Sequence, residues 1–146
     1  MKKLFILISL FAAVSMYAGD NTTTMTPIMN RAEEIVKYIE GEMNFEIVRM
    51  EYDILRTSKT TTRYLSNGWT YMIVAFGDFR FKDIDVKVYR KDDGYWQEIG
   101  KDNDDSSVAI VSISPEQDAE YGIEITAYSF NEGYEVGHYG LIIAHE

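Results

Sequence analysis

Residues 69–90 read WTYMIVAFGDFRFKDIDVKVYR, and this stretch decides the fold. Its first part, residues 69–77, is apolar at both odd and even positions, which is typical of a strand covered on both faces. Its second part, residues 83–89, alternates between apolar and polar positions, which indicates one face on the core and one in water. The stretch therefore predicts two β-strands joined by an acidic bend.

The same two-residue period recurs on either side of this pair. Strands are expected at residues 46–56, 60–66, 69–77, 83–89, 95–99, 107–113, 121–129 and 138–145. Ser66-Asn67-Gly68 is expected as a hairpin turn, and Asp92-Asp93-Gly94 as a second tight turn. Eight short strands at near-regular spacing predict a mainly β fold, an antiparallel β-sandwich of the jelly-roll type.

One N-terminal amphipathic α-helix is expected at residues 27–41. Thr26 is the expected N-cap, Pro27 the first helical residue and Gly41 the stop. Its apolar stripe consists of Ile28, Ala32, Ile35, Val36, Ile39 and Met43. We expect this stripe to cover the outer face of the strand at 69–77, and docking on a partner or a membrane surface is the alternative.

The N-terminus predicts export. Lys2 and Lys3 precede an apolar segment that is too short to cross a bilayer comfortably, and small residues follow it, so we expect a signal peptide at 1–18. An uncleaved membrane anchor is the alternative. Residues 19–25 are then a flexible leader and residues 26–146 a single domain. The protein is expected in the periplasm or outside the cell, without a membrane span after cleavage.

Charge and cysteine content exclude several classes of protein. The chain has no cysteine, so it is neither a disulfide scaffold nor anchored through a lipidated cysteine. Its formal net charge is −10, and loss of Lys2 and Lys3 makes it −12. A surface this acidic disfavours nucleic acid and anionic lipid as partners and suits cations.

Five segments carry a likeness to a known family. They are Asn67–Asp78, Lys82–Tyr89, Asp102–Asp105, Glu120–Ile125 and Gly137–Ile143. Together they resemble the bacterial pre-peptidase C-terminal domain, a secreted jelly-roll β-sandwich that is often attached to exported peptidases. The resemblance implies the same sandwich in a stand-alone secreted form. Because some members of that family bind calcium, it also implies a calcium ion as a candidate cofactor.

Six aspartates are candidate calcium ligands, because calcium takes six to eight oxygen ligands and carboxylates from adjacent loops supply them. They are Asp78, Asp83, Asp85, Asp102, Asp104 and Asp105. Asp83 and Asp85 lie two residues apart on one strand and share a face. The 102–105 loop joins them if the strand at 95–99 returns its end to the same edge. An ordinary solvated acidic loop is the alternative.

Five aromatic residues are candidates for a surface that binds a ligand or a partner, by stacking on sugars or by packing on a protein. They are Tyr89, Tyr95, Trp96, Tyr128 and Tyr134. The alternative is that they form cross-strand pairs that only stabilise the sheets.

No catalytic residue is predicted. The chain has no G-x-S-x-G motif and no cysteine, and His138 and His145 lie at positions of opposite parity in one strand. We therefore expect a non-catalytic binding or accessory module with a protein or carbohydrate partner. The alternatives are a secreted hydrolase with paired carboxylates and a purely structural envelope protein.

Overall fold

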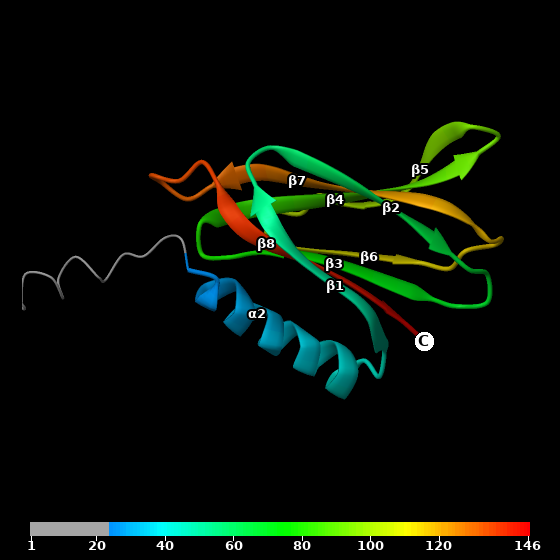
Figure 1. The fold of residues 1–146 in the computed structure, drawn as a ribbon, viewed down its shortest axis with the longest axis horizontal. Helices are drawn as coiled ribbons and strands as arrows, with labels where there is room; N and C mark the ends of the chain where they lie inside the picture. Colours follow the sequence, from blue (N-terminus) through cyan, green and yellow to red (C-terminus); the bar gives the residue numbers. More distant parts are fainter. Residues whose placement is uncertain (1–23) are drawn as a thin grey trace, which may run out of the picture.

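The computed structural model describes residues 24–146. The signal peptide expected at 1–18 and most of the leader expected at 19–25 lie outside the described residues. Within residues 24–146, the chain forms eight antiparallel strands in two four-stranded sheets, with one helical segment against the outer face of one sheet (Figure 1). No helix in this part of the chain is both long and apolar enough to cross a membrane.

The two sheets are named here by what covers them. The helix-covered sheet has the order β1-β8-β3-β6, and the open sheet has the order β2-β7-β4-β5. The strands are β1 (Glu46–Leu55), β2 (Ser58–Leu65), β3 (Tyr71–Gly77), β4 (Phe81–Asp92), β5 (Tyr95–Asp102), β6 (Val108–Ile113), β7 (Ala119–Phe130) and β8 (Gly137–His145). All eight predicted strands are present, and the antiparallel jelly-roll sandwich is confirmed.

Most connections carry the chain from one sheet to the other. Among the described strands, β4 and β5 are the one pair of successive strands that share a sheet, and their tight turn has positive φ at Asp93 (49°) and Gly94 (86°). The expected hairpin turn at Asn67-Gly68 is wrong: it joins β2 of the open sheet to β3 of the helix-covered sheet. The Asn-Gly pair predicts where the chain turns. It does not predict whether the two flanking strands pair in one sheet, because that depends on which faces of the strands are buried.

The main core lies between the sheets, and residue parity decides which side chains enter it. From β3, Tyr71, Ile73 and Ala75 face the core. They meet alternating residues of β4, β7 and β8: Ile84, Val86, Val88, Tyr121, Ile123, Ile125, Tyr139, Leu141 and Ile143. The predicted inward faces of these strands are therefore confirmed.

A second core lies under the helix. The α-helix α2 (Thr26–Lys37) and a π-helical turn η1 (Tyr38–Glu42) pack on the outer face of the helix-covered sheet. The contacts join Ile28, Ala32, Ile39 and Phe45 to Met72, Val74, Phe76, Ile142 and Ala144. The predicted seat of the helix is confirmed, and it explains why β3 is apolar on both faces.

Both predicted ends of the helix need correction. The N-cap is Met25, without a side-chain cap, and Thr26 is already helical. The α-helix ends at Lys37, and the π-helical turn continues through Gly41. The chain reverses at Asn44, which has φ = 59°. Ile39 and Phe45 are buried against the sheet and hold this last helical turn in place. The helix therefore does not end at Gly41, although glycine is a common helix stop.

One side of the sandwich is joined by charges. Strands β1 and β2 are edge strands of different sheets, and side chains of β1 at alternate positions reach toward β2. Asp53 pairs with Lys59, and Glu51 pairs with both Arg49 and Arg63. Elsewhere between the two sheets, the inward-facing side chains are apolar. Along β1 and β2, these ion pairs take their place.

Candidate functional site

The first predicted calcium ligand, Asp78, lies in a buried ion pair. It is 1% exposed, and both of its carboxylate oxygens accept hydrogen bonds from Arg80, with Nε–Oδ2 at 3.0 Å. The backbone N–H of His138 donates to Oδ2 at 3.1 Å, and the Asp78 N–H donates to the His138 carbonyl at 3.0 Å. The carboxylate thus accepts hydrogen bonds from the β3-β4 turn and from β8, and it does not join the other aspartates.

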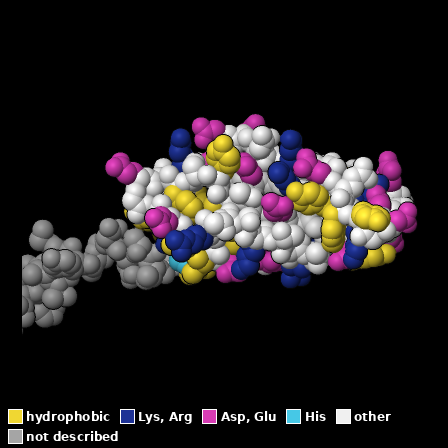
Figure 2. Space-filling model, turned by 90° about the horizontal axis from the view of Figure 1, so that it is seen from above, with side chains coloured by type: hydrophobic (Ala, Val, Ile, Leu, Met, Phe, Trp, Pro, Cys, Tyr) yellow, Lys and Arg dark blue, Asp and Glu magenta, His cyan; other side chains and the backbone are white. Residues whose placement is uncertain are grey.

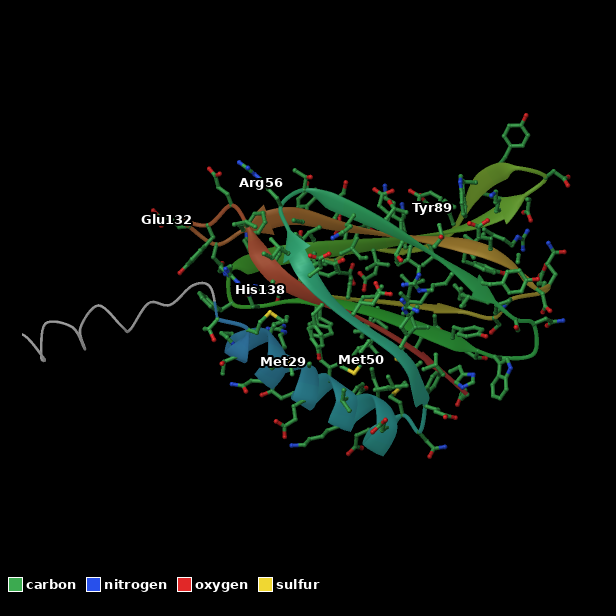
Figure 3. All side chains as sticks on the ribbon, in the orientation of Figure 1. Met29, Met50, Arg56, Tyr89, Glu132 and His138 are labelled. Atoms are coloured by element: carbon green, nitrogen blue, oxygen red, sulfur yellow. The ribbon has the colours of Figure 1, made fainter. Side chains whose placement is uncertain are left out.

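Arg80 and His138 complete this buried cluster, and the sequence analysis assigned neither of them to it. Nη2 of Arg80 lies 2.7 Å from Nδ1 of His138. A guanidinium only donates, so Nδ1 is the acceptor and the neutral imidazole carries its proton on Nε2. Figure 3 places His138 at the end of the sandwich opposite the β4-β5 hairpin. No local pattern marked Arg80 as buried, because it is a charged residue between two apolar ones.

Three of the other aspartates line one pocket. Asp83 and Asp85 of β4 and Asp105 of the β5-β6 loop line a pocket of about 440 Å³. Its remaining walls are Lys82, Asn103, Tyr128 and Ser129. Two backbone contacts hold the loop on β4: the Ile84 N–H donates to the Ser106 carbonyl (2.8 Å), and the Ser106 N–H donates to Oδ1 of Asp83 (3.3 Å). We call this the acidic pocket.

Asp102 and Asp104 do not line the acidic pocket. The Asp102 carboxylate accepts the backbone N–H groups of Asp104 (3.1 Å) and Ile110 (2.8 Å), so it ties the loop to β6. Asp104 is exposed on the loop. Within residues 24–146, no three His, Asp or Glu side chains are grouped closely enough to hold a metal ion. Calcium binding at this edge stays a prediction.

Asp85 is the electrostatically strained member of the pocket. Its Oδ1 is buried and has no hydrogen-bond partner. Burial raises the pKa of Asp85 above its usual value, and the nearby charges of Asp83 and Asp102 raise it further, while Lys87 acts weakly in the other direction. A bound cation would relieve this repulsion, and so would a proton.

Replacing Asp85 with asparagine tests this electrostatic description. The pKa of Asp85 is higher in the folded protein than in the unfolded chain. Ionisation of Asp85 therefore lowers the free energy of unfolding, and this loss develops as pH rises from the unfolded-state pKa through the folded-state pKa. Asp85→Asn is therefore expected to unfold at higher urea concentration than the wild type at neutral pH. The advantage should vanish as pH falls below the ordinary carboxyl range. Urea midpoints between pH 3 and pH 8 measure the difference, and a pH-independent difference would contradict the assignment.

The same variant separates calcium binding from simple repulsion. If calcium binds the acidic pocket, millimolar calcium raises the melting temperature of the wild type relative to chelator, and Asp85→Asn removes most of that rise. Asp104→Asn is the matched control, since Asp104 carries the same charge outside the pocket. An unchanged wild-type midpoint would remove calcium from this edge.

The five candidate aromatic residues do not form one patch. Tyr95 projects from the β4-β5 turn, and Tyr128 stands at the acidic pocket. Tyr134 packs edge-on against Phe79, with ring centroids 5.6 Å apart, in the β7-β8 loop. Tyr89 and Trp96 come together on the outer face of the open sheet. Figure 3 shows Tyr89 on this sheet, on the side of the sandwich away from α2.

Tyr89 and Trp96 line a shallow hollow of about 340 Å³ on this face, called the sheet hollow below. All four strands contribute to it: Thr60 and Thr62 from β2, Gly122 and Glu124 from β7, Tyr89 from β4 and Trp96 from β5. Thr62, Gly122 and Tyr89 are direct cross-strand neighbours, so they form one row across the sheet. Figure 2 views this side of the molecule and shows separate apolar side chains among acidic and basic ones.

Gly122 allows Trp96 to reach over the sheet. A Cβ at Gly122 would stand 3.3 Å from Cζ3 of the indole and 3.5 Å from Cε3, so the six-membered ring lies directly over the glycine. The Lys91 ammonium lies 5.4 Å from the ring centroid, and it is paired with Glu120 at 3.0 Å. The indole is supported from two sides and is still 45% exposed.

Glu124 is also held in place. Its Oε2 accepts the Tyr89 hydroxyl at 3.1 Å, and its Oε1 lies 3.5 Å from the Thr126 hydroxyl. Burial raises the pKa of Tyr89, and the Glu124 carboxylate raises it further, so the phenol stays a donor. Sequence reasoning identified the two aromatics of the sheet hollow but not Thr60, Thr62, Gly122 or Glu124. The glycine was the available signal, because a glycine inside a strand often marks a close approach.

Comparison with known proteins gives a likeness of fold. No family model and no curated protein matches the sequence. Among solved structures, the chain is similar to PliG of Aeromonas hydrophila, a periplasmic inhibitor of g-type lysozyme (12% identity, 67% of this chain, 85% of that chain, TM-score 0.48). It is similar to the pre-peptidase C-terminal domain of a Bacillus anthracis collagenase (11% identity, 65% and 87%, TM-score 0.48). It is also similar to the Yersinia pseudotuberculosis-derived mitogen (13% identity, 66% and 83%, TM-score 0.46).

The second of these structures is a member of the family that the sequence resembles. At this level of identity the likeness concerns the arrangement of strands, and it does not assign the chain to that family.

Proposed function

We propose that this protein is an exported, non-catalytic binding module, and that the sheet hollow is its binding surface. The observation that carries the proposal is the exposed indole of Trp96, which is laid over Gly122 and held there by Lys91. A half-exposed tryptophan in a fixed orientation offers a large contact area at little cost in conformational entropy.

The other walls of the sheet hollow support the same proposal. Glu124 is fixed by Tyr89, and Thr60 and Thr62 of β2 line the hollow on the side away from β5. A few oriented polar groups beside an aromatic surface are typical of ligand sites. The hollow is open and shallow, which suits recognition of an extended molecule and gives no enclosed space for chemistry. The basic and apolar residues at the start of the chain support placement in the periplasm or outside the cell.

Trp96→Ala is expected to abolish binding to insoluble bacterial cell-envelope material, measured by co-sedimentation of the full chain. A central aromatic anchor carries much of the energy of an interface, so the loss should be about tenfold or more in affinity. Trp69→Ala is the matched control: Trp69 is 46% exposed, against 45% for Trp96, and it lies on His145 of the helix-covered sheet, outside the sheet hollow.

Both variants should keep the wild-type melting temperature within a few degrees, since neither indole is in the core. Equal co-sedimentation of Trp96→Ala and Trp69→Ala would refute the sheet hollow as the binding surface. So would the absence of any co-sedimentation of the wild type.

A further inference from the structure

We infer that the ligand of the sheet hollow is a neutral carbohydrate chain. This inference rests on the proposed function and names the chemical class that the hollow fits. A sugar ring has a face of C–H groups and a rim of hydroxyls, so it needs an aromatic surface and both donors and acceptors of hydrogen bonds. The sheet hollow holds these groups within one opening.

The aromatic part of the match is Trp96. Contact with Gly122 and Lys91 fixes the orientation of the indole, and nearly half of its surface stays open to solvent. Stacking of a planar ring on an apolar ligand face is strongest when the ring is held before binding, because no side-chain entropy is then lost. Gly122 is thus a positioning residue: its missing Cβ sets the height at which the indole lies above the sheet.

The polar part of the match comes from three strands. The hydroxyls of Thr60 and Thr62 each donate and accept, and the Glu124 carboxylate accepts. Glu124 already receives the Tyr89 hydroxyl, which fixes the carboxylate at the wall of the hollow. Because neighbouring strands lie about 4.8 Å apart, the distance from β2 to β5 is roughly 14 Å, enough for a ligand longer than one ring.

The charges around the sheet hollow exclude other classes of ligand. Among residues 24–146, no lysine or arginine lines it, and its one charged wall is the carboxylate of Glu124. The nearby Lys91 is paired with Glu120. Anionic glycans and single-stranded nucleic acid need cationic walls.

The test uses Trp96 as its own reporter. The chain has two tryptophans, so Trp69→Phe leaves Trp96 as the single indole. The full chain with this change is titrated with linear oligomers of glucose, xylose, mannose and galactose, and with an oligomer of galacturonic acid as the anionic probe. At least one neutral oligomer is expected to shift Trp96 emission and to protect the indole from acrylamide, whereas the galacturonic acid oligomer is not.

Three further variants locate the binding. In the same background, Gly122→Ala should weaken the affinity for the neutral oligomer about threefold, because the new Cβ would stand 3.3 Å from Cζ3 and shift the indole by a few tenths of an ångström. Tyr89→Phe keeps the ring, removes the hydrogen bond to Glu124 and should weaken the affinity less. Tyr128→Ala, on the same sheet at the acidic pocket, should leave the affinity unchanged.

The outcomes separate this inference from the proposed function. Failure of every neutral oligomer, or binding of the galacturonic acid oligomer alone, overturns the carbohydrate inference. Equal affinity in Gly122→Ala and the parent overturns the positioning role of Gly122. If no oligomer binds while Trp96-dependent co-sedimentation persists, the proposed function stands with a ligand of another class. If co-sedimentation does not depend on Trp96, the proposed function itself fails.

Discussion

Asp78→Asn should destabilise the protein by about 3–5 kcal/mol, the usual cost of removing one partner from a buried ion pair. Asp78 and Arg80 are both almost fully buried, and the carboxylate accepts Nε and Nη2 of the guanidinium. Asparagine keeps the shape of the side chain and removes the negative charge that balances Arg80. Urea unfolding at neutral pH measures the loss as a lower midpoint at an unchanged slope.

Two further variants identify the cause of this loss. Asp53→Asn, which breaks the half-exposed pair with Lys59, should cost about 1 kcal/mol or less. Combining Asp78→Asn with Arg80→Met removes both charges, and it should recover part of the stability that Asp78→Asn loses alone. If Asp78→Asn costs no more than Asp53→Asn, the buried pair does not hold this end of the sandwich.

Gly137→Ala should lower the free energy of unfolding by about 1–3 kcal/mol. The substitution adds a methyl group where the ring of Phe81 already lies. A Cβ at Gly137 would stand 2.3 Å from Cε2 of Phe81, and one at Gly77 would stand 2.4 Å from Cδ2. Phe81 is buried and also packs on Phe130, with ring centroids 4.8 Å apart. The ring therefore has no free direction in which to move.

A double-mutant cycle shows whether the ring is responsible. Phe81→Leu shortens the side chain, so Gly137→Ala should cost less in that background, with a coupling energy of about 1 kcal/mol or more. Gly41→Ala is the control glycine, since nothing lies within 4 Å of its would-be Cβ, and it should not lower stability. Thermal unfolding with equal losses in both backgrounds would show that Phe81 does not cause the effect.

Much of the fold could be predicted because two-residue periodicity states which face of each strand is buried. The alternation of Ile84, Val86 and Val88 marked the main core, and the second apolar face of β3 marked the seat of the helix. Periodicity does not state which strands become neighbours. Asn67-Gly68 was therefore expected to close a hairpin, although the strands that it joins lie in different sheets.

Only the shared face of Asp83 and Asp85 follows from closeness in sequence, because they lie two residues apart on β4. Asp105 lines the same pocket because β5 returns the β5-β6 loop to that edge of the sheet. The sheet hollow depends instead on register, since Thr62, Gly122 and Tyr89 come from three strands that are distant in sequence. The burial of Asp78 had no local signal either: its partner Arg80 is a charged residue, and the contact with His138 crosses 60 residues of chain.

The charged residues of β1 have a consequence for how copies of this protein meet. Arg49, Glu51 and Asp53 point inward from an edge strand, where their charges are balanced by Lys59 and Arg63 of the same molecule. A second molecule that added its own strand to this edge would have to bring its side chains against these ions. The inward-pointing charges of β1 thus disfavour the growth of an intermolecular sheet along its unpaired backbone.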